Sequence, residues 1–278
     1  MQGGLAPDRR EADIVAERPL GAHSQGFLSM SDFDRGFARP GTVAAPDMAV
    51  DAGLRAFMLG VYNKLGLGLI LSAALSYVTG TVPAVGNLLF RTDAFGRTGY
   101  TTLGYVVAFA PIGILLFQRF ARQQSPQSAA FTYWSIVGLF GASMGAWFHV
   151  YQIDGILQTF LVTAGAFGGL SLVGYTTKKD LTAMGSFLIM GLVGLILASV
   201  VSLFVHAPAL VFAINLIGVG IFAGLIAYDT QRLKMTYYQI GGNEAALNMA
   251  TSYGALSLYL DFINLFQFLL YFMGGSRR

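Results

Sequence analysis

The sequence predicts an all-α integral membrane protein with seven transmembrane helices. Of its 278 residues, 55% are hydrophobic and only 11% are charged, whereas a soluble domain carries about 25% charged residues. The apolar residues gather into seven runs, each near the roughly 20 residues that a helix needs to cross a bilayer. Lys and Arg cluster beside these runs, as expected at one face of a membrane. We therefore expect a transmembrane domain over residues 56–274.

Residues 1–55 are polar and rich in Gly, Pro and charge, without a sustained period, which indicates a disordered cytosolic tail. A basic start followed by an apolar core is missing, so no cleavable signal peptide is expected. The sequence has no Cys, which excludes disulfides, thiolate catalysis and Cys-based metal sites. The small excess of Lys and Arg over Asp and Glu does not indicate nucleic acid as a partner.

The seven runs predict the helices in order, with boundaries good to a few residues. They are 57–78, 100–120, 131–150, 156–175, 184–205, 209–229 and 253–272. The connections are short except for 79–99 and 230–252. Three Gly-x-x-x-Gly pairs are candidates for close helix crossings: Gly141/Gly145, Gly165/Gly169 and Gly220/Gly224.

The distribution of Lys and Arg predicts the orientation of the helices. Four basic groups fall on one side, which we assign to the cytoplasm, and they place the N-terminus inside and the C-terminus outside. These groups are Arg39 with Arg55, Arg119 with Arg122, Lys178 with Lys179, and Arg232 with Lys234. Lys64, within the first helix, is expected to extend toward the cytoplasmic interface.

Two acids in the last two helices are the main functional candidates. Asp229 ends the sixth run and Asp261 lies inside the seventh, where an ionisable side chain is costly and usually functional. Ser257, Asp261 and Asn264 follow at i, i+4 and i+7, so they form one stripe that must face the bundle interior or water. Two plainer interpretations stay open, namely a hydrogen-bond network that only joins helices, and Asp229 exposed at the interface.

The two acids predict a pH-sensitive cluster if their carboxyls meet. Carboxyls within hydrogen-bonding reach share a proton, and their ionised form offers oxygen ligands to a divalent cation such as calcium. Arg119, Arg122 and Arg232 are candidate counter-ions on the same side. Asp229 and Asp261 lie at the same depth in the membrane only if the sixth helix continues past Arg232 or the seventh begins late.

Thr159, Thr163, Phe167 and Ser171 recur at steps of four in the fourth helix. This mostly polar face is expected to pack against a neighbouring helix rather than line a pathway, although both interpretations stay open.

Three motifs in this order resemble the Bax inhibitor-1 family of seven-helix membrane proteins. They are Gly224–Leu233 with its Ala-Tyr-Asp-Thr-Gln core, 160–167 running into 174–181, and 255–266. The resemblance covers about residues 52–274 and extends to bacterial members, which implies a bacterial inner (plasma) membrane protein. The long polar N-terminus departs from the compact family pattern.

The resemblance implies a fold with the seventh helix at the centre, wrapped by the other six. It also implies a calcium leak governed by pH through an aspartate pair, here Asp229 and Asp261, with Ser257 and Asn264 beside the ion pathway. In the family an Arg of the second helix is a counter-ion, a role that falls to Arg119 or Arg122. Some bacterial members are described as modulators of a membrane-anchored, ATP-dependent protease.

Three functions therefore compete. We favour a passive, pH-sensitive leak of calcium or other cations across the lipid bilayer, with protons as the controlling partner, without a cofactor and without enzymatic activity. An intramembrane aspartyl protease would need Gly-x-Gly-Asp at its second acid, where this chain has Leu258-Tyr259-Leu260-Asp261. The alternative is a membrane-embedded regulator that binds a membrane-anchored protease or another partner without transport.

Overall fold

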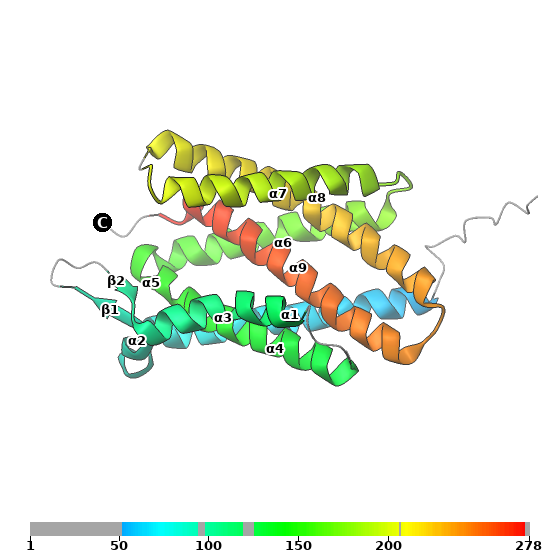
Figure 1. The fold of residues 1–278 in the computed structure, drawn as a ribbon, viewed down its shortest axis with the longest axis horizontal. Coiled ribbons are helices and arrows are strands. Elements are labelled where there is room, and N and C mark those ends of the chain that lie inside the picture. Colours follow the sequence, from blue (N-terminus) through cyan, green and yellow to red (C-terminus); the bar gives the residue numbers. More distant parts are fainter. Residues whose placement is uncertain (1–51, 94–97, 119–124, 206, 276–278) are drawn as a thin grey trace, which may run out of the picture. The chain divides into compact units, whose positions relative to one another are not determined.

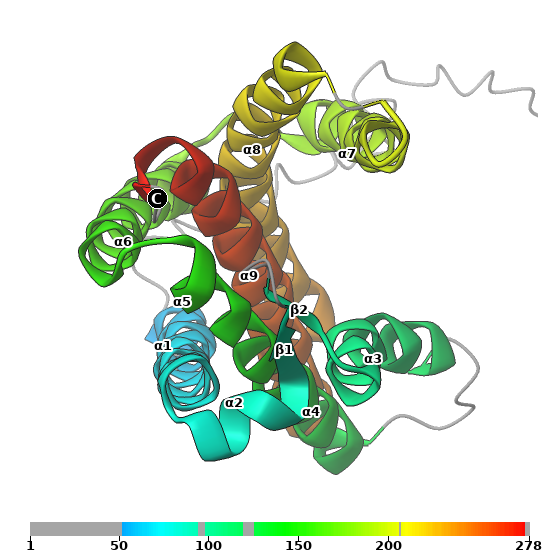
Figure 2. The ribbon, with the colours of Figure 1, turned by 90° about the vertical axis from the view of Figure 1, so that its left-hand side faces the viewer.

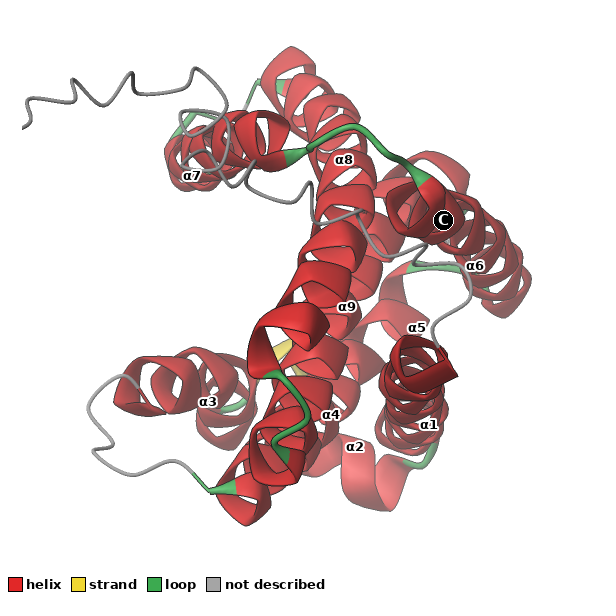
Figure 3. Cartoon of the chain, turned by 90° about the vertical axis from the view of Figure 1, so that its right-hand side faces the viewer, coloured by secondary structure: helices red, strands yellow, loops and turns green. Residues whose placement is uncertain are grey.

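The computed structural model describes residues 52–93, 98–118, 125–205 and 207–275, all within one compact unit. Residues 1–51 of the expected tail lie outside the described residues. Helices make up nearly all of the described chain (Figure 3). An all-α membrane protein is therefore confirmed as the fold class.

Each of the seven predicted runs corresponds to helix in the structure. The elements are α1 (Ala52–Thr81), α2 (Pro83–Leu89), α3 (Thr102–Gln118), α4 (Pro126–Ser143), the 3-10 turn η1 (Met144–Ala146), α5 (Trp147–Val150), α6 (Ile153–Thr176), α7 (Thr182–Ser202), α8 (Pro208–Ile240) and α9 (Glu244–Met273). Among the described residues, α1, α6, α7, α8 and α9 are long and apolar enough to cross a membrane. α3 is shorter, and the third predicted run is divided among α4, η1 and α5.

Helix α9 lies among the other long helices (Figures 1 and 2). It packs against α1, α4, α6 and α8. Half of its most apolar stretch is buried, a larger share than in α1, α6, α7 or α8. By contrast, α3 packs chiefly on α4, and α7 packs on α8. A residue on α9 is therefore placed to contact several helices at once.

The connection between the first two predicted runs contains structure that the sequence did not reveal. Helix α2 and an antiparallel hairpin of β1 (Phe90–Thr92) and β2 (Thr98–Tyr100) fill it, with Arg91 opposite Gly99. The hydroxyl of Tyr100 donates a hydrogen bond to the Ser143 carbonyl at 3.1 Å and so ties the hairpin to the end of α4. Strands of three residues are too short to show an alternating pattern.

The prediction of a long connection over residues 230–252 was wrong, because most of this segment is helical. Helix α8 runs to Ile240 and α9 begins at Glu244. The turn between them has Gly241 and Gly242 at φ of 62° and 85°, a left-handed conformation that ends helices and favours Gly. The Asn243 side chain then accepts a hydrogen bond from the Ala246 amide and caps α9. The sixth predicted helix therefore continues past Arg232. This is one of the two arrangements that would bring Asp229 and Asp261 to the same depth in the membrane.

One of the three Gly-x-x-x-Gly pairs marks a tight crossing. A Cβ on Gly141 would lie 2.6 Å from the Ser72 Cα, and one on Gly145 would lie 2.8 Å from the Gly80 nitrogen, so both glycines press against α1. Gly165 and Gly169 face open space, as does Gly220, and Gly224 meets only the side chain of Leu188. The second and third pairs therefore do not mark backbone contacts, because a Gly spacing shows where helices can approach and not where they do.

We expect Gly141→Ala to lower the free energy of unfolding by about 1–3 kcal/mol, because its methyl group meets backbone that cannot yield. Gly165→Ala is the matched control, since its new methyl group meets open space. Thermal unfolding in detergent measures both variants. Equal melting temperatures would contradict the tight crossing between α1 and α4.

Candidate functional site

The structure brings both predicted acids together between α8 and α9. The Asp229 Oδ1 lies 3.2 Å from the Arg232 guanidinium, and the Ser257 hydroxyl donates a hydrogen bond to Asp229 Oδ2. The carboxyl of Asp261 is within hydrogen-bonding reach of that of Asp229. Asp229 is 5% exposed and Asp261 is 6% exposed, so the pair is buried. The interpretation of Asp229 as an exposed interfacial residue is therefore wrong.

The contact between two carboxyls has a chemical requirement. An ionised carboxylate can only accept hydrogen bonds, so two carboxyls bond to each other when one of them carries a proton. The Oδ2 atom of Asp261 has no hydrogen-bond partner among the described residues. This oxygen is buried and is the part of the pair that the described residues leave without a partner.

Arg232 is the counter-ion of the pair within the described part of the chain. It follows Asp229 by one turn of α8, and its Nη2 also donates to the Ser257 hydroxyl at 3.1 Å. Its guanidinium lies 5.7 Å from the centre of the Tyr228 ring. The side chain is 48% exposed, so it links the buried pair to the surface. The other candidates, Arg119 and Arg122, lie outside the described residues.

Of the predicted stripe on α9, Ser257 and Asp261 belong to the acid cluster. The Asn264 amide instead donates to the Leu260 carbonyl of its own helix at 2.7 Å. Within the ranges that the structure describes, no group of three or more His, Cys, Asp or Glu forms a metal site. Calcium takes about six to eight oxygen ligands, so an ion here would need water or carbonyl oxygens besides the two carboxylates.

The next residues of α8 hold neighbouring segments in place. Thr230 shares a hydrogen bond of 3.0 Å with the Ser171 hydroxyl of α6. The Gln231 amide donates to the Lys179 carbonyl and accepts from the Leu181 nitrogen, both at 2.8 Å. Side chains on successive faces of α8 therefore join it to α9, to α6 and to the loop between α6 and α7.

Two lysines have structural partners that the sequence reasoning missed. Lys64 Nζ donates to the Ser252 hydroxyl at 2.7 Å and so joins α1 to α9. Lys234 is 6% exposed and donates to the Tyr175 carbonyl at 2.6 Å. The position of Lys64 within an apolar run indicates that its side chain needs a polar partner. The sequence does not indicate which one, because the partner lies 188 residues away.

The mostly polar face of α6 serves packing. Thr159 and Thr163 are 0% exposed, and each donates its hydroxyl to a carbonyl four residues earlier. The Phe167 ring packs on Phe262 of α9 with centroids 5.6 Å apart. This result agrees with the favoured interpretation of that stripe.

Comparison with known proteins gives relatives along most of the chain. An uncharacterized protein of Caulobacter vibrioides is 59% identical over 89% of this chain and 100% of the relative. A second, from Rickettsia prowazekii, is 41% identical over 85% of this chain and 96% of its own length. The inner membrane protein YbhL of Escherichia coli is 39% identical over 81% of this chain and 94% of YbhL.

The relatives are bacterial, one of them is an inner membrane protein, and five described helices are able to cross a membrane. The chain is therefore an integral protein of the bacterial inner membrane. A family model described as "Inhibitor of apoptosis-promoting Bax1" matches residues 54–278. The chain therefore belongs to the Bax inhibitor-1 family, to which its three sequence motifs point.

Proposed function

We propose that the chain is a pH-sensitive cation leak, with calcium as the transported ion, controlled by Asp229 and Asp261. The observation that supports this proposal is the contact of two buried acids from consecutive helices beside one Arg. Placing ionisable groups inside a membrane domain is costly, and apolar side chains would join two helices without that cost. A role in joining helices alone therefore explains the pair poorly.

In the closed state the cluster connects α8 to α9. Asp229 accepts from Ser257 and pairs with Arg232, while one proton lies between Asp229 and Asp261. Charge-assisted hydrogen bonds are about twice as strong as neutral ones. The cluster thus holds α9, a helix that packs against four others.

Opening follows when the charge balance changes. A second proton, or a divalent cation at the free oxygen of Asp261, removes the attraction that Asp229 has for Arg232. Arg232 is half exposed and can turn outward into water. Its release breaks the connection to Ser257 and lets α9 shift against its neighbours. The ion then moves down its own gradient, so the chain acts as a conduit and not as an enzyme, and it needs no cofactor.

The proposal includes seven membrane crossings. Besides the five long helices, α3 would form one crossing, and α4 with η1 and α5 would form another. An odd number places the two termini on opposite sides. This topology puts on one side the start of α1 with Arg55, the loop after α6 with Lys178 and Lys179, and the last third of α8 with Arg232 and Lys234. The N-terminal side is then cytoplasmic.

Calcium entry into vesicles containing the purified protein tests the proposal at pH 6 and pH 8. We expect the wild type to leak more at pH 6, because protonation releases Arg232. In Asp229→Asn and in Asp261→Asn the rate of calcium entry at pH 6 should be close to the rate at pH 8. The double variant should show no further loss, since residues that act as one unit are not additive. Asp154→Asn is the control, because that acid is exposed at the start of α6.

Folded wild-type protein that passes no calcium at either pH would contradict the conduit. It would favour the alternative, a regulator that binds a membrane-anchored protease or another partner. Cleavage of a membrane peptide that depends on both acids would instead revive the protease interpretation.

Removal of the counter-ion gives an independent prediction. In Arg232→Gln calcium entry should already be high at pH 8 and should change little down to pH 6, because the cation whose release opens the wild type is absent. Arg55→Gln is the matched control, since it removes an exposed Arg from the start of α1. A full pH profile of calcium entry measures both, and identical profiles for wild type and Arg232→Gln would show that Arg232 does not hold the closed state.

A further inference from the structure

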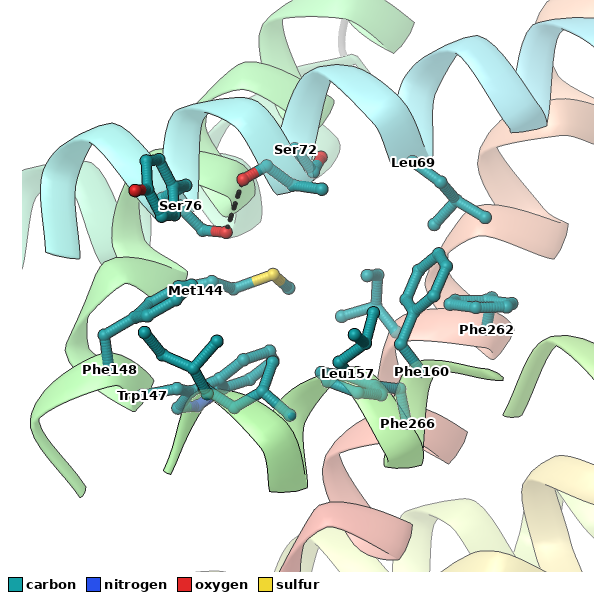
Figure 4. A pocket seen from close by; sticks show the side chains of 15 residues that line it. Leu69, Ser72, Ser76, Met144, Trp147, Phe148, Leu157, Phe160, Phe262 and Phe266 are labelled. Carbon is teal, nitrogen blue, oxygen red and sulfur yellow. Dashed lines mark hydrogen bonds between the residues drawn. The ribbon is translucent and has the colours of Figure 1, made fainter. Parts of the chain in front are cut away.

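A cavity of about 310 Å³ lies between α1 and α6, away from the acid pair. Figure 4 shows Leu69 and Ser76 of α1 on one side of it and Leu157 and Phe160 of α6 on the other. The second half of α1 and the start of α6 form its sides, and η1, α5 and α9 close it. Small-molecule pockets span about 300–1,000 Å³, so this cavity suits one slender occupant.

The wall of the cavity calls for an apolar occupant. The hydroxyls that line it belong to Ser72, Ser76 and Tyr77, and both serine hydroxyls already have protein partners. Ser72 Oγ donates to the Val137 carbonyl at 3.0 Å and shares a hydrogen bond of 2.7 Å with the Tyr259 hydroxyl. Ser76 Oγ donates to the Ala73 carbonyl at 3.0 Å, the dashed line in Figure 4. A polar ligand would gain little from the two serines, because their hydroxyls are already satisfied.

Aromatic packing keeps the cavity from closing. Trp147 packs on Phe266 with ring centroids 5.2 Å apart, and Phe160 packs on Phe262 at 5.5 Å. At the far end of α1, a Cβ on Gly80 would lie 2.7 Å from the Phe148 ring. This close approach fixes α5 against α1. The wall therefore cannot collapse to fill the space.

The opening of the cavity faces the bilayer. Leu157 is 56% exposed, Tyr77 55% and Ile153 47%, and all three line the cavity from helices able to cross a membrane. In an inner membrane protein, what surrounds such side chains is hydrocarbon. An empty apolar cavity forfeits the contacts that its lining atoms would make, so the adjacent acyl chains fill it.

We propose that this cavity binds one acyl chain of a membrane phospholipid. The chain enters between α1 and α6 and reaches the face of α9 formed by Phe262 and Ile263. These residues directly follow Asp261 in the sequence, so the bound chain supports the helix that carries the acid. The binding site itself does not depend on the proposed leak.

The two tryptophans of the chain make a direct test possible. Trp147 lines the cavity and Trp134 does not, so Trp134→Phe leaves a single reporter. Bromine atoms quench tryptophan fluorescence on contact. The Trp134→Phe protein is placed in vesicles of phosphatidylcholine with brominated or unmodified acyl chains. We expect the brominated chains to quench Trp147.

A matched pair of substitutions separates the cavity from the outer surface. Ala73 lines the cavity, whereas its neighbour Ala74 is exposed on α1 outside it. Ala73→Phe fills the space with a ring and should remove most of the quenching. Ala74→Phe should leave the quenching unchanged. If Ala73→Phe does not fold, Leu157→Ala widens the opening and should raise the quenching, while Leu161→Ala, exposed but outside the cavity, should not.

Three results would overturn the proposal. The first is equal quenching in Ala73→Phe and Ala74→Phe, and the second is equal quenching in Leu157→Ala and Leu161→Ala. The third is that an added brominated free fatty acid quenches Trp147 whereas brominated phospholipid does not. The last result would assign the cavity to a free fatty acid instead.

Discussion

The contact between the carboxyls of Asp229 and Asp261 is the interaction on which the proposed activity depends. Two acids and one Arg would carry a net negative charge inside a membrane domain, which is costly. In the proposed mechanism one shared proton removes that charge, and the exposed side of Arg232 connects the cluster to water. The same contact joins α8 to α9, the helix packed among four neighbours. A change in one proton can therefore alter the packing of several helices.

The two halves of α9 meet different surroundings. Ser257 and Asp261 belong to the charged cluster with α8, whereas Phe262 and Phe266 pack against aromatic side chains of α6 and α5. The acyl-chain cavity lies on this apolar half. Because a helix transmits a displacement along its axis, lipid in the cavity and protons at the acids act on one rigid element. Membrane composition and pH would then influence the same equilibrium.

Much of the fold and of the site could be predicted from the sequence. Apolar runs of about 20 residues predict helices because a helix satisfies its own backbone hydrogen bonds inside the bilayer. An acid such as Asp261 stands out within such a run. The α8 extension could be predicted only as one of two alternatives, because the polar residues after Arg232 end the apolar run without ending the helix. The partner of Lys64 and the open surroundings of Gly165 depend on packing between distant segments. The cavity likewise exists only once α1, α5 and α6 are assembled.

The location of the shared proton tests the central claim most directly. Infrared spectra of the protein in vesicles at neutral pH record the C=O stretching band of a protonated carboxyl. We expect this band in the wild type and in Asp154→Asn, its absence in Asp261→Asn, and a shifted or missing band in Asp229→Asn, because the hydrogen-bond partner changes. A missing band in the wild type, or a band that Asp229→Asn leaves unchanged, would contradict the shared proton.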